Sequence, residues 1–193
     1  MLARLVLAST SPYRRELLSR LRIPFETTNP GVDECDRAGE PPLVRAERLA
    51  HEKAVAVARK FPDALIIGSD QVAAMGDIIL DKPGTHERAT TQLRMVSGRE
   101  VVFYTAVALH DAASGDTSVR VIPCWAQFRR LDAREIEAYL LADRPYDCAG
   151  AAKAESLGIA LLDAMRGDDP TALIGLPLIA TAQLLRARGI AVP

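Results

Sequence analysis

The sequence predicts a mixed α/β fold in which helices flank an elongated mixed sheet. Two apolar segments, 5–8 and 64–69, have the continuous hydrophobicity of buried strands. Between them, a periodic apolar stripe at 41–60 predicts a long amphipathic helix. A hairpin rich in β-branched and aromatic residues follows near the middle of the chain. Strands and helices therefore do not alternate strictly, which favours a sheet of mixed direction over a regular βα repeat.

The first expected strand leads into a segment, 9–15, that reads S-T-S-P-Y-R-R. Ser11 before Pro12 is typical of an N-cap and a first helical turn, and it predicts a helix over 12–21. The positive end of this helix, the hydroxyls of Ser9 and Ser11, and a neighbouring guanidinium would together suit a phosphate. The segment is equally compatible with an ordinary helix start whose two arginines, Arg14 and Arg15, face water.

The next elements are expected to bring carboxylates and lysines onto loops. A short strand at 24–28 precedes a turn that delivers Asp33 and Glu34. The buried strand at 64–69 is expected to end at Asp70 and Gln71. A further apolar run at 78–80 leads into the loop that holds Lys82. A helix is then expected over 85–96, stopping near Gly98.

The second half of the chain begins with an antiparallel hairpin. Its strands are expected at 100–110 and 117–129, joined by a polar turn. Asp132 and Glu135 have the spacing of a capping box, which opens a helix to about residue 142. A strand is expected at 157–165. The last helical region starts at Asp169-Pro170, and Pro177 should interrupt it.

Composition limits the classes of function. The 193 residues suffice for one well-packed domain over 1–193, and 24 basic residues nearly balance 25 acidic ones, so no global field attracts nucleic acid. Scattered cysteines and histidines predict neither a zinc site nor a disulfide framework. The chain shows no signal-peptide pattern and no apolar run of membrane-spanning length, so we expect a soluble cytoplasmic protein without a membrane partner.

Several side chains could carry phosphate chemistry. Asp70 sits where a strand is expected to emerge, a position from which open α/β sheets present ligand-binding groups. With Asp33 and Glu34 it offers the hard oxygen ligands that Mg²⁺ prefers. Basic side chains at four positions could neutralise phosphates: Arg14, Arg15, Lys53 and Lys82. Each residue also has an ordinary interpretation, as a capping aspartate, a loop acid or a surface cation. The sequence lacks a P-loop, a nucleophile elbow and an H-E-x-x-H motif.

Motifs along nearly the whole chain resemble, in order, those of the Maf family of nucleotide pyrophosphatases. They are S-x-S-P-x-R-R at 9–15, V-D-E at 32–34, E-K-A at 52–54, G-S-D-Q at 68–71, D-K-P at 81–83, S-G at 97–98 and C-A-G-x-x-K-x-E at 148–155. The resemblance implies a Maf/Ham1-like (ITPase-like) fold with a cleft between two lobes. It also implies a divalent metal cofactor, Mg²⁺ or Mn²⁺, and hydrolysis of nucleoside triphosphates to a monophosphate and pyrophosphate.

The same resemblance assigns roles to matching positions. Asp70 would accept a proton from water, Glu34 and Asp70 would hold the metal, and Lys82 would act in catalysis. The phosphates would be bound by Ser9, Arg14, Arg15, Lys53 and Lys82. Lys153 would lie near the site.

Residues at three positions bear on the choice of base. Gln71 and Glu155 resemble the branch of the family that acts on 7-methyl-GTP, and not the branch that acts on dTTP and UTP. A carboxylate at Glu155 could accept guanine's adjacent N–H donors. The ring of Tyr13 could stack on the cationic methylated base, a contact worth roughly 0.5 to 2 kcal/mol.

The sequence leaves alternatives open. The chain could be a pyrophosphatase for dTTP or UTP, or a non-catalytic regulator of septum formation, with which the family is associated. A nucleic-acid-binding module is disfavoured by the near-neutral charge. The expected partner is therefore a small-molecule nucleotide and not a nucleic acid. The sequence leaves a homodimer open.

Overall fold

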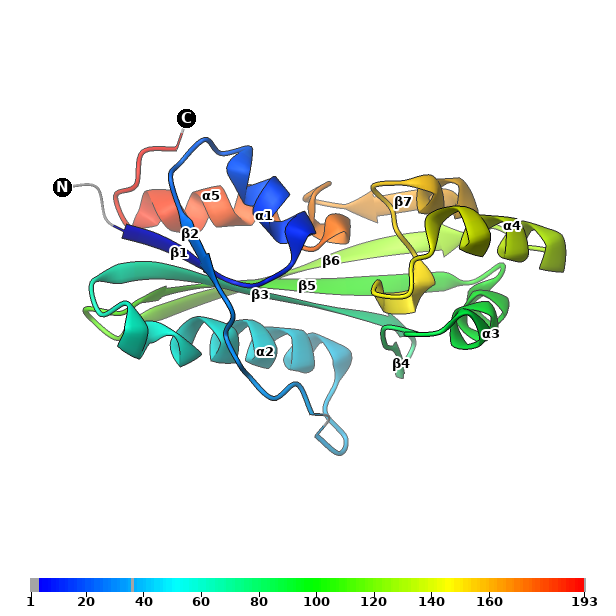
Figure 1. Cartoon of the computed structure of the whole chain (residues 1–193), viewed down its shortest axis with the longest axis horizontal. Helices are drawn as coiled ribbons and strands as arrows, with labels where there is room; N and C mark the ends of the chain where they lie inside the picture. The colour runs from blue at the N-terminus through cyan, green and yellow to red at the C-terminus, as the bar shows by residue number, and fades with distance from the viewer. Residues whose placement is uncertain (1–3, 36, 193) are drawn as a thin grey trace.

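The computed structural model describes residues 4–35 and 37–192, and a single elongated sheet runs along the long axis of the molecule (Figure 1). Within the described ranges the sheet has seven strands, in the order β2-β1-β3-β5-β6-β7, with β4 paired to β3. β1 is parallel to β2 and β3, and the remaining pairs are antiparallel. The predicted mixed α/β class is confirmed.

The strands are β1 (Arg4–Ala8), β2 (Glu26–Thr28), β3 (Ala64–Met75), β4 (Ile78–Leu80), β5 (Glu100–Asp111), β6 (Thr117–Phe128) and β7 (Leu162–Gly167). The α-helices are α1 (Pro12–Ser19), α2 (Pro42–Ala56), α3 (His86–Val96), α4 (Ala133–Asp143) and α5 (Leu178–Ala187). Short 3-10 helices are η1 (Ala58–Lys60), η2 (Ala149–Ala151), η3 (Leu157–Leu161) and η4 (Ala172–Ile174).

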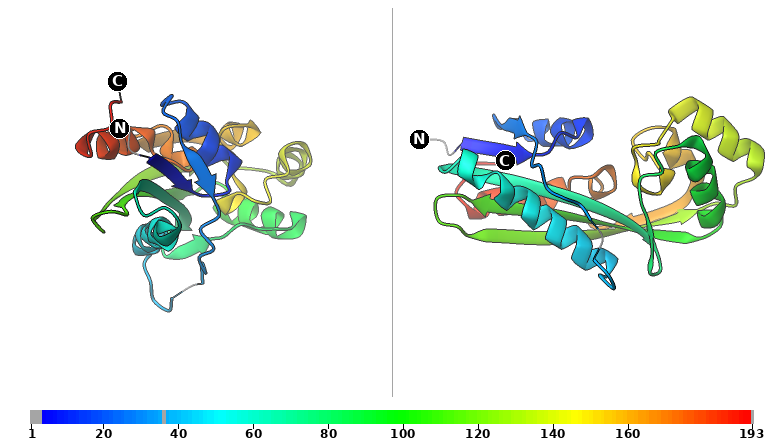
Figure 2. Two further views of the ribbon diagram at one scale, coloured as in Figure 1. Left: turned by 60° about the vertical axis from the view of Figure 1, so that its left-hand side comes forward. Right: turned by 60° about the horizontal axis from the view of Figure 1, so that its bottom comes forward.

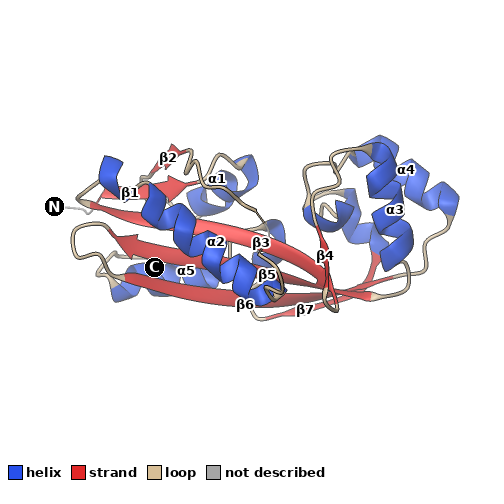
Figure 3. Cartoon of the chain, turned by 90° about the horizontal axis from the view of Figure 1, so that it is seen from below, coloured by secondary structure: helices blue, strands red, loops and turns tan. Residues whose placement is uncertain are grey.

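Helices form two groups along the sheet. At one end, α2 covers one face, while α1 and α5 cover the other (Figures 1 and 3). Successive side chains on a strand point to opposite faces of the sheet, so each strand contributes to both helix interfaces. Val6 and Ile66 pack with α2, whereas Leu7 and Ile67 pack with α1 and α5. At the other end lie α3 and α4 (Figure 2). Their buried side chains belong to a separate apolar cluster that includes Phe103. The elongated sheet thus carries two groups of helices, one toward each end (Figures 1 and 3).

Most boundaries agree with the local signals. Ser11, Thr85 and Asp132 cap α1, α3 and α4 through their side chains, and Asp132 forms the predicted capping box with Glu135. Pro177 is the N-cap residue of α5, so it separates this helix from η4 as expected.

Two expectations about strands are wrong. The first half of the segment at 157–165 forms η3, and β7 begins only at Leu162. More importantly, β3 does not end before Asp70 and Gln71 but continues to Met75, so both residues lie in the middle of a strand. Antiparallel pairing with β5 sustains β3 through this polar stretch, since Asp70 is opposite Ala106 and Gln71 is opposite Thr105.

Asp70 nevertheless lies where a neighbouring strand stops. The pairing between β1 and β3 reaches Ile67, because β1 ends at Ala8. Beyond that point the β1 side of β3 is open to loops. Alternation along β3 places Gly68 and Asp70 toward α2, and Ser69 toward the opposite face. The carboxyl end of β1 thus lies beside the middle of β3, close to Asp70.

Gly68 lets α2 approach the sheet closely. A Cβ atom at this position would lie 2.2 Å from the carbonyl oxygen of Ala50 and 2.6 Å from the backbone nitrogen of Ala54. Both atoms belong to the backbone of α2, so the whole helix would have to move. We expect Gly68→Ala to lower the free energy of unfolding by about 1–3 kcal/mol or more. Denaturant unfolding measures this cost, and an unchanged midpoint would contradict the packing described.

Candidate active site

A cavity of about 510 Å³ lies between the two groups of helices, a size suited to a small-molecule ligand. Its walls come from the β1–α1 connection, the loop before α2, α2 itself, the middle of β3, the segment around β4, the segment 147–155 and the η4 segment. It therefore opens at the carboxyl end of β1, where open α/β sheets commonly bind ligands. The cleft implied by the family resemblance is present.

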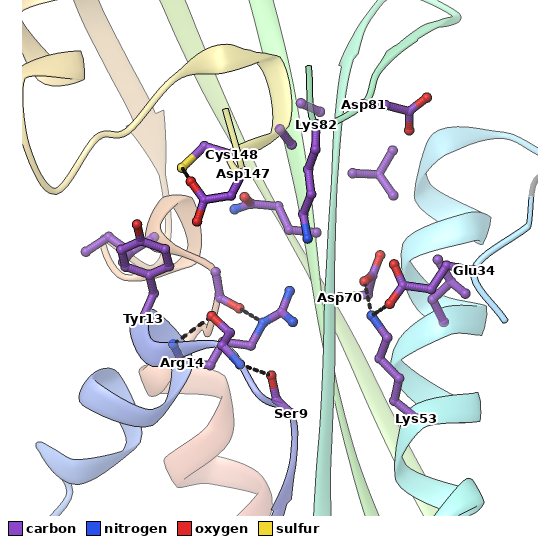
Figure 4. Close-up of a pocket in the computed structure, with 18 of the residues that line it drawn as sticks. Ser9, Tyr13, Arg14, Glu34, Lys53, Asp70, Asp81, Lys82, Asp147 and Cys148 are labelled. Atoms are coloured by element: carbon purple, nitrogen blue, oxygen red, sulfur yellow. Dashed lines mark hydrogen bonds and ion pairs between the residues drawn. The ribbon is translucent and has the colours of Figure 1, made fainter. Parts of the chain in front are cut away.

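One wall carries a lysine between two carboxylates. Lys53, on α2, is buried, and its Nζ lies 2.6 Å from Oδ1 of Asp70 and 2.7 Å from Oε1 of Glu34 (Figure 4). Partial burial would raise the pKa of Glu34, but the hydrogen bond from Lys53 and the positive charges of Lys53, Lys82 and Arg14 outweigh it and lower the pKa. Three residues far apart in sequence thus form one charged cluster.

Arg14 reaches the cavity from the first turn of α1. Its Nε donates a hydrogen bond of 2.9 Å to the carbonyl oxygen of Gly175, and its terminal nitrogens point into the cavity (Figure 4). Burial lowers the pKa of Arg14, while the nearby carboxylates of Asp70 and Glu34 act in the opposite direction. A guanidinium remains charged at any physiological pH, so this group brings a fixed positive charge to the cavity.

The serines before α1 are arranged as helix-capping groups. Oγ of Ser9 accepts from the backbone nitrogen of Ser11 at 3.1 Å, and Oγ of Ser11 accepts from the backbone nitrogen of Arg14 at 3.4 Å. Both residues line the cavity. Because a hydroxyl that accepts a hydrogen bond keeps its own hydrogen to donate, both can still serve an anion.

The other predicted cations lie in different places. Lys82, on the loop after β4, is exposed and lines the cavity, where its ammonium points inward (Figure 4). Arg15 is exposed and does not line the cavity, because successive side chains on a helix point about 100° apart and Arg14 takes the inward direction. Lys153 also lies outside the lining, with its Nζ 5.6 Å from the centre of the Tyr13 ring.

A second wall is aromatic and acidic. Tyr13, Asp147, Cys148 and Glu155 line it, and the first three lie across the cavity from Asp70 in Figure 4. The Cys148 thiol donates to Oδ1 of Asp147 at 3.6 Å. Burial, Asp147 and Glu155 together raise the pKa of Cys148 to about 12. Burial raises the pKa of Glu155, and the neighbouring carboxylates of Asp143 and Asp147 raise it further. This wall therefore holds two carboxyl groups, those of Asp147 and Glu155, with the ammonium of Lys153 beside the Tyr13 ring.

Gln71 is committed largely to the protein itself. Its Nε2 lies 3.0 Å from Oγ1 of Thr105 and 2.9 Å from the carbonyl oxygens of both Ala172 and Leu173. A primary amide has two N–H donors, so these acceptors use its donating capacity. Gln71 lines the cavity, and its Oε1 keeps its capacity to accept hydrogen bonds. Its predicted part in base selection stays a prediction.

Several contributors to the cavity were missed in the sequence, among them Asp147 and the η4 segment. Asp147 precedes the C-A-G-x-x-K-x-E motif directly, and this adjacency was the available signal. The η4 segment contributes Leu173, Ile174 and Gly175, partly through backbone carbonyls. No side-chain pattern marks a carbonyl that faces a site. Asp33, in contrast, is exposed, does not line the cavity and accepts from the backbone nitrogen of Cys35.

Glu34 and Asp70 are the candidates for holding a divalent cation. Among the described residues, no group of three or more His, Cys, Asp or Glu side chains is arranged to hold a metal ion. Mg²⁺, however, is commonly bound by one or two carboxylates with substrate phosphates and water. Each carboxylate contacts Nζ of Lys53 through one oxygen, so the two groups lie close together and each has a second oxygen to offer to a small cation. The pair fits such an ion.

The helices of the described ranges include none that is both long and apolar enough to cross a membrane.

Residues 4–188 match the model of a family described as Maf-like protein. A protein of Polaromonas sp. (strain JS666) named 7-methyl-GTP pyrophosphatase is 57% identical over 187 residues, which cover 97% of this chain and 85% of the relative. A protein of the same name from Albidiferax ferrireducens is 54% identical over 98% of this chain and 95% of the relative. Among solved structures, the Ham1 protein of Staphylococcus aureus matches with a TM-score of 0.47 and 14% identity, covering 65% of this chain and 71% of that chain.

Proposed function

The chain belongs to the Maf family, and on that premise we propose that it hydrolyses 7-methyl-GTP to 7-methyl-GMP and pyrophosphate. One observation carries the proposal: a single cavity joins the cluster of Lys53, Asp70 and Glu34 to the cations Arg14 and Lys82. Phosphoryl chemistry requires a group that positions and deprotonates water, and positive charge on the leaving phosphates. The two sets of residues supply these requirements in one place.

In the proposed reaction, water attacks the α-phosphorus of the triphosphate. The Asp70 carboxylate accepts the proton of this water, while Lys53 holds the carboxylate in position. The bond between the α-phosphorus and the oxygen that bridges to the β-phosphorus breaks, and pyrophosphate leaves with the bonding electrons. Arg14 and Lys82 stabilise the charge that develops on it, and the hydroxyls of Ser9 and Ser11 donate to its oxygens.

We propose Glu34 and Asp70 as the residues that would hold Mg²⁺ or Mn²⁺. When bound, such a cation supplies positive charge at the phosphate oxygens. We also propose that 1–193 act as one catalytic domain on free nucleotides in the cytoplasm.

The acidic wall supports a methylated guanine as the base. N7-methylation gives guanine a positive charge, which the carboxylates of Asp147 and Glu155 would attract. The ring of Tyr13 would stack on the cationic base. Glu155 would accept from guanine's adjacent N–H donors.

Release of pyrophosphate across a panel of triphosphates tests the proposed function. The panel contains 7-methyl-GTP, GTP, ATP, UTP and dTTP, each assayed with Mg²⁺, with Mn²⁺ and with excess chelator. We expect the highest kcat/KM for 7-methyl-GTP and no turnover in chelator. A higher kcat/KM for UTP or dTTP would assign the protein to the other branch of the family. No release from any nucleotide would refute an enzymatic role.

We expect Glu155→Ala to reduce the preference for 7-methyl-GTP over UTP by roughly 5- to 150-fold, because it leaves guanine's donors unpaired in a desolvated site. Tyr13→Ala should lower kcat/KM more for 7-methyl-GTP than for GTP, since stacking on the cationic ring is lost. The measurement is the ratio of kcat/KM values in each variant. Glu87→Ala, at an exposed position on α3 away from the cavity, is the matched control. Unchanged ratios with lower absolute rates would exclude a role in base selection.

A further inference from the structure

Three polar side chains on the sheet form what we call the polar clamp: Ser69, Gln71 and Thr105. Ser69 and Gln71 are two residues apart on β3, so they share one face of the sheet. Thr105 on β5 lies directly opposite Gln71 in the antiparallel register. Ser69 and Thr105 are fully buried, and Gln71 is partly buried. The clamp therefore stands on two long paired strands at the centre of the sheet.

The polar clamp binds the backbone of the η4 segment. Oγ1 of Thr105 donates to the carbonyl oxygen of Ala172 at 2.8 Å and accepts from Nε2 of Gln71 at 3.0 Å. Gln71 also donates to carbonyl oxygens at positions 172 and 173. Oγ of Ser69 donates to the carbonyl oxygen of Gly175 at 3.0 Å. Three side chains thus fix a short segment whose own backbone hydrogen bonds are those of a 3-10 turn.

The same segment supports Arg14, the cation at the first turn of α1. The carbonyl oxygen of Gly175 that accepts from Ser69 also accepts from Nε of Arg14, at 2.9 Å. With Nε held, the plane of the guanidinium is set and its two terminal nitrogens point into the cavity (Figure 4). Gly175 has a φ of 123°, which L side chains rarely adopt, so the orientation of this carbonyl depends on glycine.

We propose that the polar clamp positions Arg14 for the triphosphate, acting through the backbone of the η4 segment, and that Thr105 is its central positioning residue. This inference rests on the proposed function, since it takes Arg14 as a phosphate-binding group. It assigns a role to Ser69 and Thr105, and it gives the Gln71 amide nitrogen a task that is separate from reading the base. Supporting partners that orient a binding group commonly contribute about 10- to 100-fold to its effect.

The test compares isosteric variants in two measurements. Thr105→Val removes the hydroxyl, Thr105→Ser retains it, and Ser69→Ala removes the other hydroxyl in case the valine variant does not fold. Thr181→Val is the matched control, because Thr181 is also buried and donates to one backbone carbonyl, that of Pro177, but lies on α5 away from the cavity. Affinity for inorganic triphosphate is measured by calorimetry, and kcat/KM is measured with 7-methyl-GTP.

We expect Thr105→Val and Ser69→Ala to weaken triphosphate binding and kcat/KM by about 10-fold or more, with Thr105→Ser and Thr181→Val close to the wild type. In an Arg14→Ala background, Thr105→Val should add no further loss, because the group that it positions is gone. An equal loss in both backgrounds would overturn the inference. If no nucleotide is hydrolysed but triphosphate binding shows this non-additivity, the proposed function fails and the positioning role stands.

Discussion

Replacing Asp70 by asparagine is expected to reduce pyrophosphate release from 7-methyl-GTP by about 10²- to 10⁴-fold, the contribution typical of a positioned general base. The amide has the size of the carboxylate and can still accept the hydrogen bond from Lys53, but it cannot accept a proton from water. Asp70→Asn also weakens one of the two candidate cation ligands. The fold should persist, because the substitution leaves the pairing of β3 with β5 intact.

Steady-state rates with 7-methyl-GTP and saturating Mg²⁺ measure the effect of Asp70→Asn. Circular dichroism and the thermal midpoint establish that the variant is folded. Asp63→Asn, an exposed aspartate before β3 that does not line the cavity, makes the same chemical change without consequence for the site. A folded Asp70→Asn protein with wild-type turnover would show that another group deprotonates the water.

The second large effect is expected for Arg14→Ala, which removes a fixed positive charge from the proposed leaving phosphates. The loss of one preorganised donor of this kind costs about 10²-fold or more in turnover. Lys82→Ala should act in the same direction. Because Lys82 is exposed and Arg14 is partly buried, we expect the larger loss for Arg14→Ala.

Arg15→Ala is an exact match for Arg14→Ala in composition and net charge, and it sits at the next position of the same helix. Its side chain faces away from the cavity, so we expect kcat and KM close to those of the wild type. Equal losses in the two variants would mean that the phosphates respond to the general charge of α1. A loss confined to Arg15→Ala would place the phosphates outside the cavity described here.

The sequence predicted local structure well wherever a single residue determines a helix boundary. Ser11, Asp132 and Pro177 mark helix boundaries through capping or through a missing backbone N–H, and all three lie where expected. It also singled out Asp70, Lys53 and Glu34, although only the folded chain shows that one ammonium contacts both carboxylates. Spacing in the sequence contains no information on that distance.

The end of β3 was misplaced because the run of apolar residues ends at Ser69, whereas pairing with β5 continues the strand beyond that point. Pairing with β5 is a non-local property, and so is the open side left by the short β1. The choice between Arg14 and Arg15 depends on the rotation of α1, which its packing through Leu17 and Leu18 decides. The role of the Gly175 carbonyl could not be predicted from the sequence. Every residue has a backbone carbonyl, and only the fold decides which of them point toward a site.

The central position of Asp70 on a long strand has a consequence for local opening. At Asp70, β3 is paired on one side only, with β5, but that pairing runs from Leu65 to Ala74, so the backbone there opens only when the two central strands of the sheet separate. Other groups of the site come from a first helical turn, which holds Arg14, and from loops, which hold Glu34, Lys82 and Asp147. Such segments open at a lower free-energy cost. As the protein approaches its unfolding transition, it would therefore release its hold on the triphosphate and the base while the reactive carboxylate is still in place.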